Sequence, residues 1–267
     1  MSLGANLRAM PTMLRVGLAE TIAYRAEMIV WILTTTMPLV MLSLWTSVAD
    51  EAPFRAYSQA DFVAYYLAAL IVRNLTSNWV AWQIGEEIRT GVLSMRLLRP
   101  VHPFAGYLAT HLGAIPLRTV VVLPVVVILF LTDARHVVVT DAPRVALFVL
   151  SIAGAWLLTF GMFVVIGALA FFLEKSMALV EVYFGLFMLL SGYLIPLDLM
   201  PGWLASAAEW MPFRYMLGTP VELLIGRMDT GAAAEAVTAQ WGWATAMMIA
   251  GVLVWRRGIH RFEAYGA

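Results

Sequence analysis

The sequence contains no cysteine and a single lysine, Lys175. Without cysteine the chain has no disulfide, no thiolate metal site and no cysteine nucleophile. The four histidines, His102, His111, His136 and His260, are scattered and lack the spacing of metal ligands. We therefore expect no metal ion to be bound by this chain.

Charge is also scarce. Only 13% of the residues are charged, whereas a water-soluble domain typically has about 25%. Hydrophobic residues make up 62%, and the mean hydropathy is +0.83. This composition indicates an integral membrane protein. The formal net charge is zero, so no nucleic-acid partner is expected.

Motifs for catalysis and nucleotide binding are missing as well. There is no G-x-x-x-x-G-K-[ST] loop, and Lys175 follows Glu174 without a glycine-rich approach. H-E-x-x-H and G-x-S-x-G motifs are absent too. The ionisable residues inside the long apolar runs are Arg73, Arg118 and Glu181, and arginine is a poor general base because it stays protonated. We expect no catalytic residues and no enzyme activity in this chain.

What the sequence does contain is long apolar runs. About 20 apolar residues in a helix cross the roughly 30 Å hydrocarbon layer of a bilayer. Backbone groups in lipid must be satisfied internally, so these runs predict an all-α membrane protein. Arg73 and Asn74 interrupt the second of them. The six predicted spans are residues 28–49, 62–82, 107–131, 145–173, 176–197 and 241–255.

The distribution of lysine and arginine predicts the orientation of these spans. Ten of these residues fall on one side and five on the other, and the side with more positive charge is normally the cytoplasmic one. Both termini are therefore expected in the cytoplasm. The ten are Arg8, Arg15, Arg25, Arg89, Arg96, Arg99, Lys175, Arg256, Arg257 and Arg261, and the five are Arg55, Arg135, Arg144, Arg214 and Arg227.

Two segments outside the predicted spans have unusual patterns. Residues 5–25 alternate apolar and charged positions at helical spacing, which predicts an amphipathic helix at the cytoplasmic interface rather than a solvated arm. Residues 197–236 are too apolar for a free loop and too broken by proline and glycine for a span. They predict short helices that enter the outer leaflet again; the alternative is an ordinary loop with chance aromatics.

The densest charge lies in "EEIRTGVLSMRLLRP", residues 86–100. Across residues 82–103, apolar side chains recur at spacings of three and four and predict one apolar face of a short helix. Gly91 is expected to break or bend this helix, and Pro100 with Pro103 to stop it before the third span. Such an element could receive force from a soluble partner, or it could be an ordinary charged loop. The apolar positions are Ile84, Ile88, Val92, Met95 and Leu98.

Two stretches together carry a family resemblance. "EEIRTGVLSMRLLRPVHP", after the second span, and "GYLIPLDLMPGWLASAAEWMPFRYMLGTP", after the fifth, resemble the permease subunits of ABC-2 type transporters. The resemblance covers essentially the whole chain, residues 1–267, as a single transmembrane domain. It implies an N-terminal interfacial helix, a cytoplasmic coupling helix at 82–103, and re-entrant outer helices between spans five and six. It also implies a bacterial inner-membrane location.

The same resemblance implies partners and site residues. ATP and Mg would be bound by separate ABC ATPase subunits, and the permease would pair in the lipid membrane with a second one, identical or a different six-span sister. The residues implied to face the ATPase are Glu86, Glu87, Arg89, Gly91, Leu93, Leu97, Leu98, Arg99 and Pro100. Those implied to shape the outer gate are Pro196, Pro201, Gly202, Trp203, Pro212 and Phe213.

A substrate path is expected along spans two and five. A charge inside the membrane is costly, so Arg73 should face the bundle interior, a partner or water. It either contacts a polar or anionic part of a substrate or forms a structural pair, for example with Glu181. If spans two and five line the dimer axis, as the resemblance implies, Asn74, Phe184, Phe187 and Met188 join Arg73 in the path; the alternative for the aromatic residues is packing.

Three functions are compatible with these patterns. The first is the permease of an ATP-driven transporter that exports an amphipathic or hydrophobic compound. The second is a gradient-driven channel or secondary carrier, which would need no ATPase. The third is a membrane assembly subunit that transports nothing itself.

Overall fold

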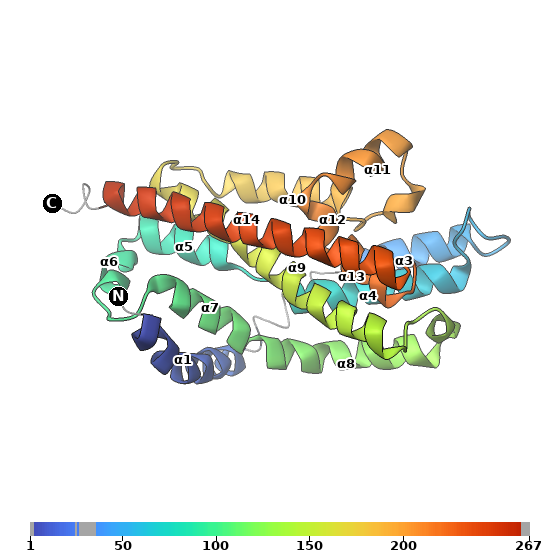
Figure 1. Ribbon diagram of the computed structural model, residues 1–267, viewed down its shortest axis with the longest axis horizontal. Coiled ribbons are helices and arrows are strands. Elements are labelled where there is room, and N and C mark those ends of the chain that lie inside the picture. The colour runs from blue at the N-terminus through green and yellow to red at the C-terminus, as the bar shows by residue number, and fades with distance from the viewer. Residues whose placement is uncertain (1–2, 25, 27–35, 263–267) are drawn as a thin grey trace.

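The computed structural model describes residues 3–24, 26 and 36–262, and within these ranges the regular elements are all helices. The helices run side by side along the long axis of an elongated bundle (Figure 1). The beginning of the first helix and the end of the last lie at the same end of this bundle. We call this the inner end and the opposite one the outer end.

The first half of the chain forms a series of helices that are separated by short non-helical segments. Residues 28–35 of the first predicted span lie outside the described residues. The elements are α1 (Leu3–Ala23), α3 (Met37–Val48), α4 (Gln59–Thr76), α5 (Val80–Arg89), α6 (Val92–Leu97), α7 (Pro103–Gly113) and α8 (Ile115–Leu131).

The second half contributes two long helices and a group of short ones between them. These elements are the 3-10 helix η1 (Asp133–His136), α9 (Ala142–Ala168), η2 (Leu169–Phe171), α10 (Ala178–Leu190), η3 (Leu197–Leu199), α11 (Gly202–Glu209), α12 (Pro212–Met216), α13 (Gly218–Leu224) and α14 (Thr230–Phe262).

Among the described residues, three helical stretches are long and apolar enough to cross a membrane: Pro103–Leu131, Ala142–Phe171 and Thr230–Phe262. Helix α9 is the central one, since 61% of its apolar window is buried against 22% for each of the other two. It packs against α14, α5, α13 and α4. The apolar core of the bundle is therefore built around α9.

The other predicted spans differ from the observed helices. Residues 62–82 are not one helix, because α4 ends at Thr76 and α5 begins at Val80. Residues 176–197 hold a helix of only 13 residues, since α10 ends at Leu190 and Gly192 takes a left-handed conformation with φ 85°. In contrast, α14 has 33 residues and extends beyond both ends of the predicted 241–255. Apolar composition did not reveal where the backbone turns.

Helix α1 occupies most of the predicted 5–25 segment and packs against α7. The contact is a close backbone crossing at two glycines. A Cβ atom on Gly17 would lie 2.8 Å from the Cα of Thr110, and one on Gly113 would lie 2.8 Å from the backbone nitrogen of Leu18. Only glycine allows this approach, so the amphipathic segment is joined to the bundle at its inner half.

The outer segment 197–236 contains the short helices η3, α11, α12 and α13 and the first turns of α14. Proline marks the start of three of them: Pro196 precedes η3, Pro201 precedes α11, and Pro212 is the first residue of α12. Pro212 suits the first position of α12 because its ring fixes φ near the helical value and the first N–H groups of a helix need no intrahelical acceptor.

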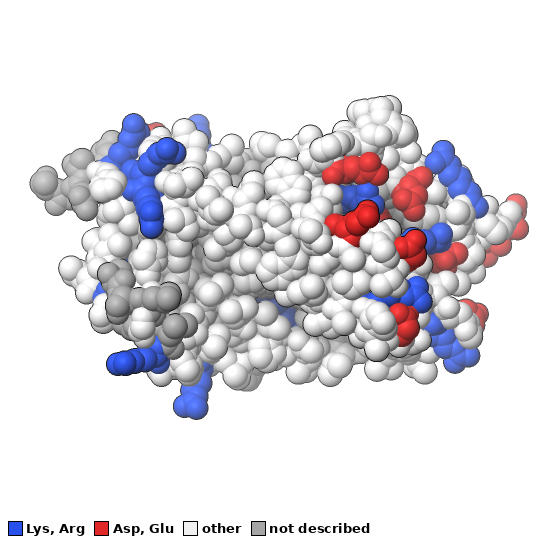
Figure 2. Space-filling model, viewed as in Figure 1, with Lys and Arg blue, Asp and Glu red and all other residues white. Residues whose placement is uncertain are grey.

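Charged side chains gather at the two ends of the bundle and leave a band with very little charge between them (Figure 2). On the visible face, the inner end shows almost only lysine and arginine, whereas the outer end mixes both signs. This pattern is typical of a protein whose middle lies in lipid and whose more positive end faces the cytoplasm.

Candidate functional site

The α5–α6 unit at the inner end is the first candidate site. Gly91 separates the two helices and takes the left-handed conformation, with φ 75°. Because of this turn, the side chains of α6 do not continue the helical periodicity of α5. The prediction of one continuous apolar face is therefore wrong. Ile84 is fully buried, whereas Met95 is 67% and Leu98 is 81% exposed.

Glu87 lies inside this unit rather than on its surface, with only 8% of the residue exposed. Its carboxylate accepts a hydrogen bond from the Tyr107 hydroxyl on α7 at 2.6 Å and forms an ion pair with Arg96 on α6 at 2.7 Å. The Arg96 guanidinium also lies 4.9 Å from the centroid of the Tyr107 ring. The family resemblance implies that Glu87 faces a partner; instead it links α5, α6 and α7.

The outward surface of the unit carries both apolar and charged side chains. Glu86 and Arg89 form an exposed pair at 2.6 Å, while Leu93 is buried and Leu97 is half-buried. We call the exposed set the α6 surface. It consists of Glu86, Arg89, Val92, Met95, Leu98, Arg99 and Pro100.

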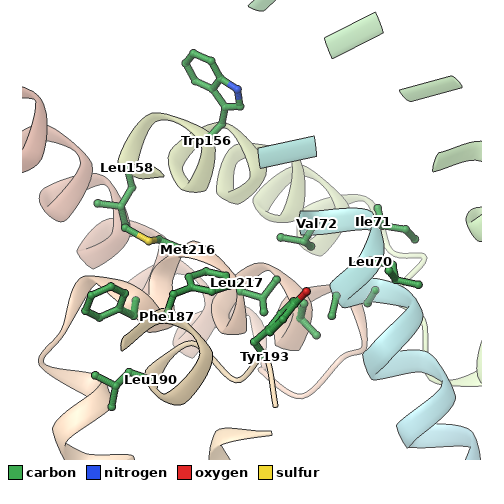
Figure 3. Close-up of a cluster of buried hydrophobic side chains, with 14 of the residues drawn as sticks. Leu70, Ile71, Val72, Trp156, Leu158, Phe187, Leu190, Tyr193, Met216 and Leu217 are labelled. Carbon is green, nitrogen blue, oxygen red and sulfur yellow. The ribbon is translucent and has the colours of Figure 1, made fainter. Parts of the chain in front are cut away.

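Arg73 and two aromatic residues form a second candidate site, in the middle of the bundle. The Arg73 guanidinium lies 5.7 Å from the ring centroid of Phe184 and 5.0 Å from that of Phe187, both on α10. Figure 3 shows Phe187 beside Tyr193, whose hydroxyl points toward α4. The structure thus brings together three of the residues predicted for a substrate path.

The other two residues of that predicted path are placed differently. The Asn74 side chain donates a hydrogen bond to the Leu70 carbonyl of its own helix at 2.9 Å. Met188 is half-buried and packs against the hydrophobic core.

The break between α4 and α5 is held by Arg118. Arg118 is only 5% exposed, and its guanidinium donates hydrogen bonds to the Ser77 carbonyl and, at 3.2 Å, to the Ser77 hydroxyl. It also lies over the Trp79 ring, 5.1 Å from the centroid. A cation is favourable at the C-terminal end of a helix such as α4. The structure therefore places Arg118 at the broken helix end.

A pocket of about 530 Å³ opens between α5 and α10 near the inner end. Its walls include Trp82 and Phe184, whose ring centroids lie 6.2 Å apart. Apolar and charged side chains share the lining, which consists of Trp82, Arg89, Glu174, Lys175, Met177, Ala178, Val180, Glu181 and Phe184.

The residues predicted for the outer gate do not converge on one point. Trp203 is 74% exposed at the start of α11, whereas Phe213 is 7% exposed and packs against Tyr183 with ring centroids 5.9 Å apart. Pro196 is buried, Pro201 and Gly202 are exposed, and Pro212 is half-buried. These residues shape the turns of the outer segment and lie on different sides of it.

Sequence reasoning missed a buried carboxylate in the same segment. Glu222 on α13 is 3% exposed and forms an ion pair with Arg214 on α12 at 3.2 Å. Burial raises the pKa of Glu222 to about 7, although Arg214 acts in the opposite direction. The signal was present, because Arg214 and Glu222 are the two charged residues in the apolar stretch 210–226.

A second ion pair ties this outer region to α4. The Arg227 guanidinium pairs with Asp61 at 2.9 Å and lies 3.9 Å from the centroid of the Tyr57 ring. Asp61 also completes a capping box with Ser58 at the start of α4. Two ion pairs therefore connect the elements of the outer end: Arg214–Glu222 joins α12 to α13, and Arg227–Asp61 joins the loop after α13 to α4.

No curated protein matches this chain. Residues 29–266 match the family described as "ABC-2 family transporter protein", which covers both candidate sites and the outer segment. The protein therefore belongs to the ABC-2 family of transporter proteins.

Proposed function

We propose that this chain is the permease subunit of an ATP-driven transporter and that a separate ABC ATPase docks on its α6 surface. The observation that carries this proposal is the exposure of Met95 and Leu98 beside Arg89 and Arg99 at the positive inner end. In a monomer such apolar side chains have no partner, and apolar patches with a polar rim mark protein contacts. Family membership supports an ATPase as that partner.

The docking contact follows from the chemistry of this surface. Val92, Met95 and Leu98 would fill an apolar groove of the ATPase, and the charges around them would set its orientation more than its affinity. ATP and Mg would be held by that partner. Movement of the docked ATPase would pass through α5 to the central helix α9, against which α5 packs.

The proposal includes a topology. Six spans, with α4–α5 as a broken second span, place both termini in the cytoplasm of a bacterial inner membrane. The positive inner end supports this orientation. Helix α1 lies at the cytoplasmic interface, and residues 197–236 form the outer re-entrant segment. A second permease, identical or a sister, completes the pair.

The transported compound is proposed to be amphipathic or hydrophobic and to be exported. Its path runs along Arg73, Asn74, Phe184, Phe187 and Met188. The outer segment forms the gate through the turns that Pro196, Pro201, Gly202, Trp203, Pro212 and Phe213 shape.

Co-purification in mild detergent tests the docking surface. The variant Met95→Ala/Leu98→Ala should lose the ATPase from the complex while folding normally, because both side chains are exposed. Leu131→Ala is the matched control, since Leu131 is 78% exposed at the outer end. This control should retain the ATPase.

Three results would contradict the proposal. Retention of the ATPase and of transport by the Met95→Ala/Leu98→Ala variant would exclude the α6 surface as the docking site. Transport by the purified chain in vesicles, driven by a gradient and without any ATPase, would favour a channel or secondary carrier. If Arg73 variants transport normally but substitutions on other faces of the bundle prevent complex formation, an assembly role is the better explanation.

A further inference from the structure

Arg73 is a cation in the bundle that has no acidic partner among the described residues. Within the described residues, none of the six ion pairs involves Arg73. Its contacts are the rings of Phe184 and Phe187, with the Tyr193 hydroxyl nearby. A charge in this position normally pairs with an opposite charge or lines a polar path.

A second cation increases the positive potential at this point. The Arg118 guanidinium binds the carbonyl of Ser77, whose backbone N–H in turn donates to the Arg73 carbonyl at 3.1 Å. Arg118 itself is directed at the Ser77 carbonyl and hydroxyl, which are neutral groups. The local positive charge is therefore not balanced by a carboxylate of the described chain, and an anion would be stabilised there.

An apolar strip connects Arg73 to the inner pocket. Phe184 takes part in both, because it faces the Arg73 guanidinium and also lines the pocket of about 530 Å³. Trp82, Met177 and Val180 continue the apolar wall toward the inner end. An apolar chain in the pocket would thus reach the Arg73 side chain along Phe184.

The side chains that line the pocket carry equal numbers of positive and negative charges. Arg89 and Lys175 are the cations, and Glu174 and Glu181 are the anions. Arg73 is consequently the group that decides which charge the bound molecule carries. The arrangement combines an apolar wall with one unbalanced cation.

We propose that this strip binds an amphiphile with a single anionic group, a carboxylate or phosphate, which Arg73 holds while the apolar body lies along Phe184 and Trp82. Guanidinium matches both anions because its planar N–H groups donate two parallel hydrogen bonds. The proposal rests on the proposed function insofar as it names the class of transported compound. Binding itself needs no ATPase and is tested without one.

The test uses the full chain in phosphatidylcholine nanodiscs, with empty nanodiscs as the background. Dodecyl phosphate should bind saturably, whereas dodecyltrimethylammonium, with the same chain length, and inorganic phosphate should not. Arg73→Gln should weaken dodecyl phosphate binding about ten-fold or more, since a hydrogen bond to a charged group is lost. Arg73→Lys keeps the charge and should weaken it less.

A control variant tests whether binding requires Arg73 itself or only an arginine that lies over an aromatic ring. Arg261 lies 5.0 Å from the ring centroid of Phe172 near the end of α14, and Arg261→Gln should leave dodecyl phosphate binding unchanged. Phosphatidic acid in the nanodisc bilayer distinguishes two sources of the ligand. Displacement of the probe indicates a lipid headgroup, and no displacement indicates a free amphiphile; either result supports the anionic site.

Three results would overturn this inference. These are equal binding of both dodecyl probes, binding by Arg73→Gln that equals the wild type, and equal competition by inorganic phosphate. Dissociation of paired permeases in Arg73→Gln with unchanged probe binding would instead assign Arg73 to a permease contact. If dodecyl phosphate does not bind as expected but the ATPase still co-purifies, this inference fails and the proposed function stands. If dodecyl phosphate binds as expected but no ATPase co-purifies with the chain, the proposed function fails and this inference stands.

Discussion

The adjacent residues Glu86 and Glu87 have different environments and therefore different expected roles. Glu87 is buried and holds Arg96 and the Tyr107 hydroxyl, whereas the side chains of the Glu86–Arg89 pair are 61% and 52% exposed. Exposed ion pairs contribute little, but removal of a charged partner from a buried hydrogen bond is costly.

Glu87→Gln should consequently lower the free energy of unfolding by about 1–3 kcal/mol. Glu86→Gln, one position away, is the control and should change it by less than about 0.5 kcal/mol. Thermal unfolding of both variants in the same detergent measures the difference. Equal destabilisation would mean that Glu87 does not link α5 to α6 and α7 as described.

Glu222 predicts a pH dependence of stability at the outer end. Burial raises its pKa from 4.5 to about 7, against the attraction of Arg214 and with a contribution in the same direction from Asp198. The folded protein therefore holds a proton that the unfolded chain releases between about pH 4.5 and 7. Stability from this group is complete below pH 4.5 and decreases as the pH rises through 7.

The expected decrease is on the order of 3 kcal/mol, since each pKa unit corresponds to about 1.4 kcal/mol. Glu222→Gln mimics the protonated acid and should remove this part of the pH dependence. Unfolding of the wild type and the variant at pH 5 and pH 8 gives the comparison. If the free energies of unfolding of the wild type and the variant differed by the same amount at both pH values, the assigned protonation of Glu222 would be contradicted.

At the scale of elements, the α1–α7 crossing depends on glycine. Gly17→Ala or Gly113→Ala places a Cβ atom 2.8 Å from backbone atoms of the other helix, so the helices must separate. Alanine favours a helix by up to about 1 kcal/mol, and the clash must exceed this gain. Gly4, also in α1, has no neighbouring atom within 4 Å of the place that a Cβ atom would take, so Gly4→Ala is the control.

We expect Gly17→Ala and Gly113→Ala to lower the unfolding temperature and Gly4→Ala to leave it unchanged or raise it. The measurement is thermal unfolding of the three variants in one detergent. If all three alanine variants behaved alike, α1 would not cross α7 at these glycines.

The sequence predicted several elements of this region and missed their relative rotation. Gly91 was expected to interrupt the helix, and it does, with positive φ. Its left-handed conformation changes the helical phase, so Leu93 faces inward while Met95 and Leu98 face outward. Periodicity assumes one continuous helix, and a single glycine makes that assumption fail.

The candidate sites show the same limit. Arg73 was recognisable as an isolated charge in an apolar run, and Phe184 and Phe187 were expected on the facing span. The positions of Glu87 and Arg118 were not predictable, since each depends on a contact with a residue from another helix: Tyr107 on α7 and Ser77 at the α4–α5 break. Single-sequence patterns describe one helix at a time.

At the scale of the whole molecule, the two charged ends predict a defined orientation. The inner end shows almost only lysine and arginine on the visible face, and the outer end mixes both signs. Positive loops are retained in the cytoplasm, so the α6 surface should face the cytoplasm and α11 the opposite side.

The absence of cysteine makes this orientation directly measurable, because a single introduced thiol has no background. Ser94 on α6 and Ser206 on α11 are both exposed, and serine to cysteine is a nearly isosteric change. In intact cells a membrane-impermeant maleimide should label Ser206→Cys and not Ser94→Cys, and permeabilisation should make both react. The reverse pattern would invert the topology and remove the α6 surface from the compartment that holds ATP.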